Sequence, residues 1–215
     1  PTVSQPAPVT VMAPGPMVFP YRKDGAGYPT LAPLLRRVTP AVVNVAVESE
    51  VDLDEHPFFK DPDFRRFLEK FDLPIPESPE NGRRQSVGSG VIVNAARGFV
   101  LTNRHVIEDA ESITVTLKDR RTYRARLVGS DRNADIAVLR LTPVPSRLTA
   151  LGFGDSSRLE VGDFVLAIGN PFGIGQTVTS GIVSAIGRDG PDGAGIGDLI
   201  QTDASINPGN SGGAL

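Results

Sequence analysis

The sequence predicts an all-β fold made of two antiparallel barrels, the second of them cut short at Leu215. Three observations predict it. Apolar runs of strand length follow one another in quick succession, six of them fall before residue 143, and a further set follows after a linker. Six strands are enough to close a barrel that has no free edges. A hydrophobic content of 40% is sufficient for such a core.

Residues 1–37 are predicted to be a proline-rich arm that ends in a short helix. The first thirty residues are rich in proline and show no periodic pattern, which is typical of an extended or flexible segment. Residues 31–39 carry Leu31, Leu34 and Val38 at helical spacing, and Pro40 ends the pattern.

Residues 38–142 are predicted to form the first barrel. The six runs cover residues 41–50, 88–94, 98–103, 112–117, 123–130 and 135–142. Asp119, Arg120 and Arg121 lie between the fourth and fifth runs, where they are expected to form a hairpin turn.

An irregular segment, residues 52–86, is inserted after the first strand. It holds five of the chain's ten phenylalanines, and a loop has no core of its own in which to bury them. Two interpretations remain open. Phe58, Phe59, Phe64 and Phe67 contact an apolar partner elsewhere, or Phe64, Phe67 and their neighbours form an amphipathic helix on their own barrel.

Residues 143–215 are predicted to be a linker followed by the incomplete second barrel. Its strands are expected at 161–169, 177–186 and 199–203. The glycine-rich stretch 187–197, which includes Arg188, has no lysine and no helix signal after it, so a mobile connection is favoured over a phosphate-binding loop.

Ser211 lies between glycines in the segment Asn207–Gly213, a common setting for a nucleophilic serine. A serine hydroxyl needs a base to accept its proton as it attacks. Of the two histidines, His56 lies in a charged, proline-broken stretch, whereas His105 follows an apolar run and is expected at the rim of a strand. Asp135 begins another apolar run and is the best candidate to orient that histidine.

Each of these residues also has a purely structural interpretation. A histidine at a strand end is commonly structural, an aspartate before a strand is commonly a turn residue, and glycines beside a serine commonly mark a tight turn. The chain order His105, Asp135, Ser211 is, however, one of the known orders of a catalytic triad. Pro208 and Gly209 allow the loop to turn its N–H groups inward.

Together these segments resemble the HtrA/Deg serine proteases of the chymotrypsin-like clan. The resemblance rests on residues 88–93, 101–107 and 134–139 for the first barrel, and on 168–173, 176–184 and 201–213 for the second. It implies that His105 is the general base, Asp135 its orienting carboxylate and Ser211 the nucleophile. The N–H groups of Gly209 and Ser211 would form the oxyanion hole, where losing one donor typically costs about 3–4 kcal/mol of transition-state stabilisation.

The same resemblance implies a serine endopeptidase that cleaves unfolded or damaged proteins, forms homotrimers and works in the periplasm or cell envelope. It implies regulatory roles for the phenylalanine-rich loop and for the loop near Arg188. Met17–Tyr21 is an apolar patch suited to a subunit contact, and the alternative is that it belongs to a disordered arm. The end of the second barrel and a peptide-binding PDZ domain are expected to be missing from this chain, so the fragment alone is expected to be poorly stable or oligomeric.

Composition excludes several other classes. The net charge of −3 comes without a basic block for nucleic acid, and no apolar stretch is long enough to cross a bilayer. There is no cysteine for a disulfide framework, no intact signal peptide, and no pattern that implies a metal or cofactor. Two alternatives stay open: a non-catalytic, chaperone-like binder of unfolded chains, and a processing protease of narrow specificity.

Overall fold

The computed structural model describes residues 30–50, 83–171, 173, 175–188, 199–207 and 209–215. The chain divides into two compact units, Pro1–Arg37 and Val38–Leu215. Helix α1 (Ala32–Val38) begins where the Thr30 hydroxyl accepts a hydrogen bond from the Ala32 N–H, 3.2 Å away. Arg36 and Arg37 lie in its last turn, where positive charge is favourable, and the 3₁₀ helix η1 (Thr39–Ala41) follows.

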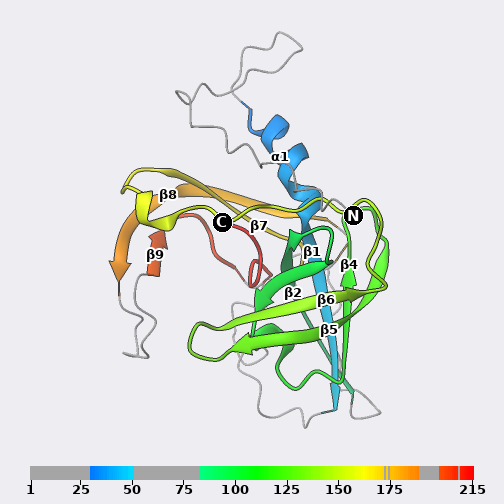
Figure 1. The fold of residues 1–215 in the computed structure, drawn as a ribbon. Coiled ribbons are helices and arrows are strands. Elements are labelled where there is room, and N and C mark those ends of the chain that lie inside the picture. Colours follow the sequence, from blue (N-terminus) through cyan, green and yellow to red (C-terminus); the bar gives the residue numbers. More distant parts are fainter. Residues whose placement is uncertain (1–29, 51–82, 172, 174, 189–198, 208) are drawn as a thin grey trace, which may run out of the picture. The chain divides into compact units, whose positions relative to one another are not determined.

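Six antiparallel strands form the closed barrel that the sequence predicts (Figure 1). Their order around the barrel is β1-β2-β3-β6-β5-β4, and pairing of β4 with β1 closes it. The strands are β1 (Val42–Glu50), β2 (Arg83–Asn94), β3 (Phe99–Asn103), β4 (Ser112–Thr116), β5 (Thr122–Asp131) and β6 (Ile136–Thr142).

The barrel interior is filled by side chains that alternate along these strands. In β6, Ala137, Leu139 and Leu141 are buried while the residues between them are not. This alternation follows from the strand period of two and directs branched apolar side chains into one core. The thirteen buried members of that core are Val43, Val45, Val47, Ile92, Val100, Val106, Ile107, Ile113, Val115, Leu117, Ala137, Leu139 and Leu141.

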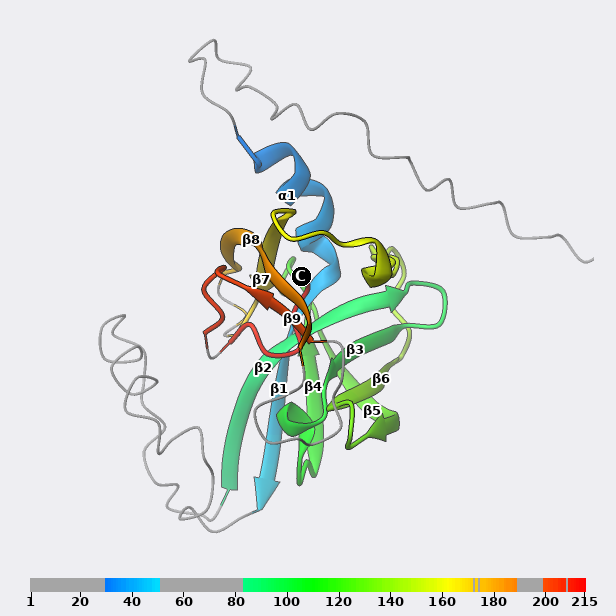
Figure 2. The same ribbon diagram turned by 90° about the vertical axis from the view of Figure 1, so that its left-hand side faces the viewer.

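Strand β2 is long and curved, and it pairs with β1 along one stretch and with β3 along another (Figure 2). A register shift between Ile92 and Asn94 marks an irregularity in its pairing with β3. The predicted loop boundary at residue 86 is wrong, because β2 already begins at Arg83. Residues 83, 84 and 85 pair with residues 50, 49 and 48 of β1, in that order. The five phenylalanines of that segment lie outside the described residues.

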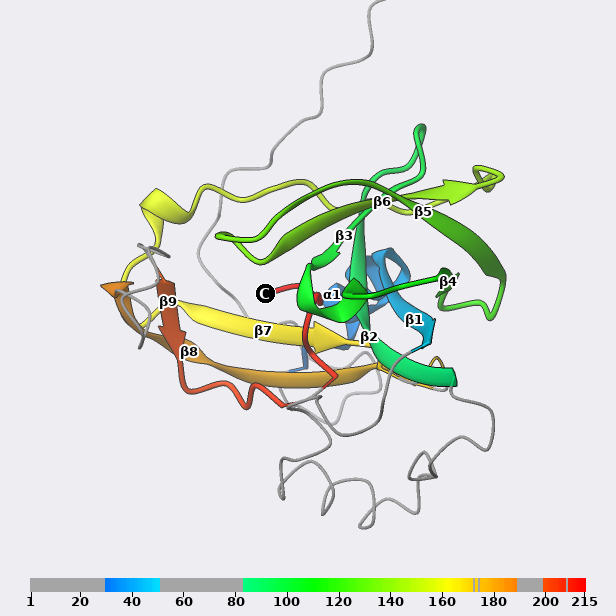
Figure 3. The same cartoon turned by 90° about the horizontal axis from the view of Figure 1, so that it is seen from below.

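The second part of the chain forms a three-stranded antiparallel sheet in the order β7-β8-β9 (Figure 3). Its strands are β7 (Phe164–Gly169), β8 (Thr177–Arg188) and β9 (Leu199–Thr202). Strand β7 begins three residues later than predicted, because Gly162 has a φ of +103° and the chain is still turning there. Its core cluster is formed by Val165 on β7, Val183 on β8 and Ala204 after β9. Ala167 and Ile168 on β7 are buried as well.

Side-chain hydrogen bonds attach the segment after β7 to the barrel. The buried Asn44 amide on β1 donates to the Pro171 carbonyl at 2.7 Å. The Gln176 amide donates to the Val42 carbonyl at 3.1 Å. These bonds join the start of β1 to the segment between β7 and β8, and so attach the second sheet to the barrel.

Candidate active site

His105 and Asp135 meet at the end of β3 and the start of β6. His105 begins the 3₁₀ helix η2 (His105–Ile107), which is anchored by the buried side chains of Val106 and Ile107. Strand β3 pairs with β6 so that Asn103 lies opposite Ile136, the residue after Asp135. The barrel register therefore brings together two residues that are 30 positions apart in sequence.

Both carboxylate oxygens of Asp135 hold His105. Oδ2 lies 2.6 Å from the ring Nδ1, and Oδ1 accepts from the His105 backbone N–H at 2.9 Å. An ionised carboxylate can only accept, so Nδ1 carries the proton and, in the neutral ring, Nε2 is the nitrogen with the lone pair of a base. Nε2 is shielded from solvent. The two side chains are about one-third exposed, at 31% and 33%, so Asp135 is less buried than a triad carboxylate usually is.

Asp135 has an unusual backbone conformation that aims its side chain. Its φ is +49°, in the left-handed region that aspartate tolerates better than most residues. The Asp135 carbonyl accepts from the Arg104 N–H at 3.0 Å, on the same short segment as the histidine. Asp135 is therefore bonded to the segment around His105 through its backbone as well as through its side chain.

The loop that carries Ser211, residues 209–213, is fastened to β2. The Ser211 carbonyl accepts from the Ser89 N–H at 2.9 Å, and the Ser89 hydroxyl donates to the Gly209 carbonyl at 2.6 Å. The same hydroxyl accepts from the Asn170 N–H at 2.7 Å. Ser89 is fully buried, so these bonds replace those that its hydroxyl would make with water.

Two positions of the Ser211 loop require glycine. Gly209 has a φ of +113°, and a Cβ there would lie 2.7 Å from Pro171 side-chain carbons. Gly212 has a φ of +77°, and a Cβ there would lie 2.2 Å from the Ser89 carbonyl and 2.3 Å from the Thr102 hydroxyl. Both the conformation and the close approach exclude a side chain, as the predicted tight turn at these glycines requires.

A shallow groove of about 290 Å³ lies beside Ser211. Apolar side chains of Ala167, Ile200, Ile206 and Leu215 line it together with polar groups of Asn103 and Thr202. Ile206 is 61% exposed, which leaves an apolar surface at the mouth of the groove. Such a surface next to a serine is suited to the side chains of an extended peptide.

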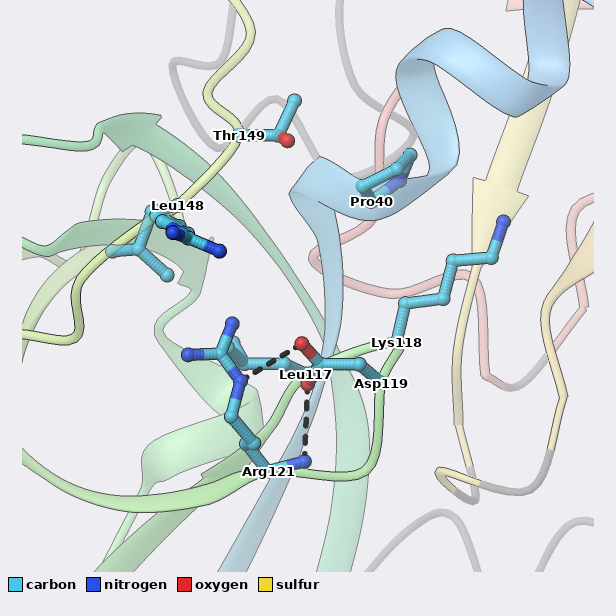
Figure 4. Close-up of a pocket in the computed structure, with 8 residues that line it drawn as sticks. Pro40, Leu117, Lys118, Asp119, Arg121, Leu148 and Thr149 are labelled. Carbon is cyan, nitrogen blue, oxygen red and sulfur yellow. Dashed lines mark hydrogen bonds and ion pairs between the residues drawn. The ribbon is translucent and has the colours of Figure 1, made fainter.

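A second cavity, of about 400 Å³, lies at the β4–β5 turn and has no serine or histidine in its lining (Figure 4). Its Arg121 donates from Nε to Asp119 at 2.8 Å and also bonds the Ser146 carbonyl. The Asp119 carboxylate raises the pKa of the Arg121 guanidinium above its ordinary value. This ion pair, in the hairpin turn that the sequence predicts, is at the surface and is structural.

The family model of the trypsin-like peptidase domain matches residues 88–215. The chain therefore belongs to the trypsin-like peptidases. It is 52% identical over 194 residues to the periplasmic pH-dependent serine endoprotease DegQ of Escherichia coli K12, which covers 89% of this chain and 40% of DegQ. It is 43% identical over 209 residues to the periplasmic serine endoprotease DegP of the same organism, with 87% and 43% covered.

Solved structures agree with these relatives. The HtrA-type protease AlgW with a decapeptide has a TM-score of 0.65 at 46% identity, covering 86% of this chain and 55% of that one. Within the trypsin-like peptidases, this chain is of the HtrA/Deg type, as the resemblance indicates, and its fold is chymotrypsin-like. It spans about two-fifths of the length of DegQ and DegP.

The names of DegQ and DegP confirm the expected periplasmic location. Among the residues that the structure describes, no helix is long and apolar enough to cross a membrane. Within that same part of the chain, no group of His, Cys, Asp and Glu side chains is arranged to hold a metal ion.

The structure brings two of the three expected catalytic side chains into direct contact and places the third on a loop bonded to the same barrel. Phe58, Phe59, Phe64 and Phe67 lie outside the described residues, as does the side chain of Arg188. Two residues that support the site, Ser89 and Asn103, were not singled out from the sequence. Ser89 lies in the motif at residues 88–93 and Asn103 in the motif at residues 101–107, and this is the one signal in the sequence that points to them.

Proposed function

We propose that this chain is the catalytic part of a serine endopeptidase. His105 acts as general base, Asp135 orients it, and Ser211 is the nucleophile. The observation that carries the proposal is the two-point hold of Asp135 on His105, at 2.6 and 2.9 Å, on the barrel to which the Ser211 loop is bonded. A side chain held in this way has one tautomer and one orientation, which a general base requires.

The reaction follows from these positions. His105 Nε2 takes the Ser211 hydroxyl proton as the oxygen attacks the peptide carbonyl, and Asp135 stabilises the imidazolium that forms. The tetrahedral intermediate carries a negative oxygen, which the N–H groups of Gly209 and Ser211 hold. The imidazolium then gives its proton to the leaving amine. Water, deprotonated by the same histidine, hydrolyses the acyl-serine ester and regenerates the free serine.

We propose unfolded or damaged proteins as substrates and the homotrimer as the assembly of the complete protein. The support is similarity to DegQ and DegP, which are endoproteases by name, and the apolar groove beside Ser211. Residues 38–142 serve as the barrel that carries His105 and Asp135, and residues 143–215 carry Ser211. Light scattering on the complete gene product distinguishes a trimer from a monomer.

Ser211→Ala tests the assignment of the nucleophile. In the complete gene product the variant is expected to lose casein cleavage by about six orders of magnitude, because a triad without its nucleophile retains only binding and oxyanion stabilisation. A fluorophosphonate probe should label the natural protein and leave the variant unlabelled. Casein cleavage that persists in the variant rules out Ser211. Failure to label the natural protein favours the non-catalytic binder.

A further inference from the structure

The Asn103 side chain, at the last residue of β3, makes two hydrogen bonds that join separate parts of the site. Its Nδ2 donates to the Asp135 carbonyl at 2.9 Å. Its Oδ1 accepts from the Gly212 N–H at 2.6 Å. One short amide therefore connects the residue that holds the histidine with the residue directly after Ser211, 109 positions away in sequence.

The orientation of this amide follows from its partners. A backbone carbonyl can only accept and a backbone N–H can only donate, so the Asn103 oxygen must face Gly212 and its nitrogen must face Asp135. The aspartate carboxylate has no donor, serine has its donor and acceptor on a single oxygen, and apolar side chains have neither function. The site therefore requires both the donor and the acceptor of a primary amide.

The bond to Gly212 completes the support of one peptide plane. The Ser211 carbonyl, on one side of the Ser211–Gly212 peptide bond, accepts from the Ser89 N–H. The Gly212 N–H, on the other side, donates to Asn103. A peptide unit is planar, so fixing both groups fixes the direction in which the chain leaves the Ser211 Cα. The lack of space for a Cβ at Gly212 shows how closely this plane lies against β2 and β3.

The bond to Asp135 acts on the other two side chains. The Asp135 carbonyl accepts from both Asn103 Nδ2 and the Arg104 N–H, while its carboxylate holds His105. These bonds oppose rotation of a residue whose φ is +49°. A change in the Asn103 bond alters the backbone from which the carboxylate extends.

We propose that Asn103 is a positioning residue that sets the geometry of Ser211 relative to the His105–Asp135 pair. This inference rests on the proposed serine endopeptidase function. Asn103 does not react and acts through two backbone partners. Misplacement of reacting groups by about 1 Å costs on the order of 10²-fold in rate, so loss of this link should reduce turnover far more than substrate binding.

The test measures kcat and KM separately on a fluorogenic peptide, with the complete gene product. Asn103→Ala should lower kcat by about 10- to 100-fold and leave KM within about threefold. Asn103→Asp is nearly isosteric and keeps the acceptor for the Gly212 N–H, but it places an oxygen against the Asp135 carbonyl. We expect its kcat to fall by about 10-fold or more as well.

Two asparagines of the same barrel serve as controls. Asn94→Ala removes one exposed hydrogen bond, to the Arg97 N–H at 2.9 Å, and should leave kcat unchanged. Asn44→Ala removes another buried amide, which donates to the Pro171 carbonyl at 2.7 Å, and reports the effect of losing a buried hydrogen bond that involves neither Asp135 nor Gly212. Thermal melts of all variants are recorded, and kcat is expressed per serine that a fluorophosphonate labels at completion.

Three outcomes overturn the proposal. The first is a kcat of Asn103→Ala within about threefold of the natural protein, and the second is full activity of Asn103→Asp. The third is an Asn44→Ala variant that melts at the same temperature as Asn103→Ala and loses as much kcat. If Asn103→Ala does not fold, the Asn103→Asp result decides. Failure of the proposed function is distinguishable, because the natural protein would then resist the fluorophosphonate and Ser211→Ala would leave cleavage unaltered.

Discussion

The contact between Asp135 and His105 restricts the histidine in two ways. The ring Nδ1 is held at 2.6 Å, and the backbone N–H of the same residue is held at 2.9 Å by the other carboxylate oxygen. A carboxylate that held only the ring would still allow the histidine backbone to move. Here the base and its orienting acid move together, which matters because each of the two side chains is about one-third exposed.

Ser89 plays a comparable part for the Ser211 loop. Its hydroxyl is the buried link between the Gly209 carbonyl and the Asn170 N–H. If the oxyanion is held by the N–H groups of Gly209 and Ser211, the conformation of Gly209 must be fixed in advance of catalysis. The hydroxyl of Ser89 bonds the peptide group that follows Gly209 and so restricts that conformation.

Ser89→Ala should therefore reduce both stability and turnover. The variant leaves the partly buried Gly209 carbonyl and the buried Asn170 N–H without their hydroxyl partner, a cost of about 1–3 kcal/mol in the free energy of unfolding. We expect kcat to fall by about 10-fold, since the oxyanion donors lose part of their preorganisation. Denaturant melts and steady-state kinetics measure the two effects.

Ser112→Ala is the matched control. It removes a serine hydroxyl that donates to the Glu48 carboxylate at 3.0 Å on the surface of the same barrel. Its free energy of unfolding should change by less than about 0.5 kcal/mol, with kcat unaltered. Equal kinetics in the two variants would show that Ser89 has no bearing on catalysis.

Strands β3 and β6 determine where His105 and Asp135 lie, so the barrel core beneath them supports the site. Leu139 on β6 is fully buried, and pairs with Val100 on β3. Leu127, at an irregular point of β5, is 47% exposed. These two leucines differ in burial but belong to neighbouring strands.

Leu139→Ala is expected to lower the free energy of unfolding by about 2–5 kcal/mol, because it removes buried methyl groups and leaves a cavity. Leu127→Ala should cost less than about 1 kcal/mol. Chemical denaturation monitored by circular dichroism checks both values. Similar losses for the two variants would contradict the burial of Leu139 in one closed barrel.

Strand positions were largely predictable from sequence, and their ends were not. The run at 112–117 alternates in hydrophobicity and the run at 135–142 is mostly apolar, and the structure has β4 and β6 there. The first residues of β2 gave no such signal. Arg83–Gln85 are polar, and they are strand residues because they pair with Glu48–Glu50 of β1. The local sequence pattern does not reveal this pairing.

The candidate triad was predictable, and its supports were not. His105, Asp135 and Ser211 are chemically distinctive and lie at the ends of apolar runs. Ser89 and Asn103 are ordinary polar residues at strand positions. Their importance comes from partners more than 100 positions away, Gly209 and Gly212, and is visible only once the chain is folded.

The two halves of Val38–Leu215 differ in how much apolar surface they bury. Among the described residues, the core cluster of the barrel has thirteen buried members, whereas the core cluster beside the three-stranded sheet has three. In this 215-residue chain, amide hydrogen exchange should therefore be slower in β1–β6 than in β7–β9. Mass spectrometry of exchanged peptides measures the difference. Equal protection in the two halves would mean that they open as one cooperative unit.

The peptide bond after Ser211 is held from both sides by β2 and β3, strands that are synthesised about a hundred residues earlier. The groove beside the serine, in contrast, is walled mainly by Ile200, Ile206 and their neighbours in the later half. On the proposed mechanism, reactivity and selectivity therefore depend on different stretches of the chain. Substitutions of the groove residues should then change the accepted peptide while the Ser211 hydroxyl stays aligned.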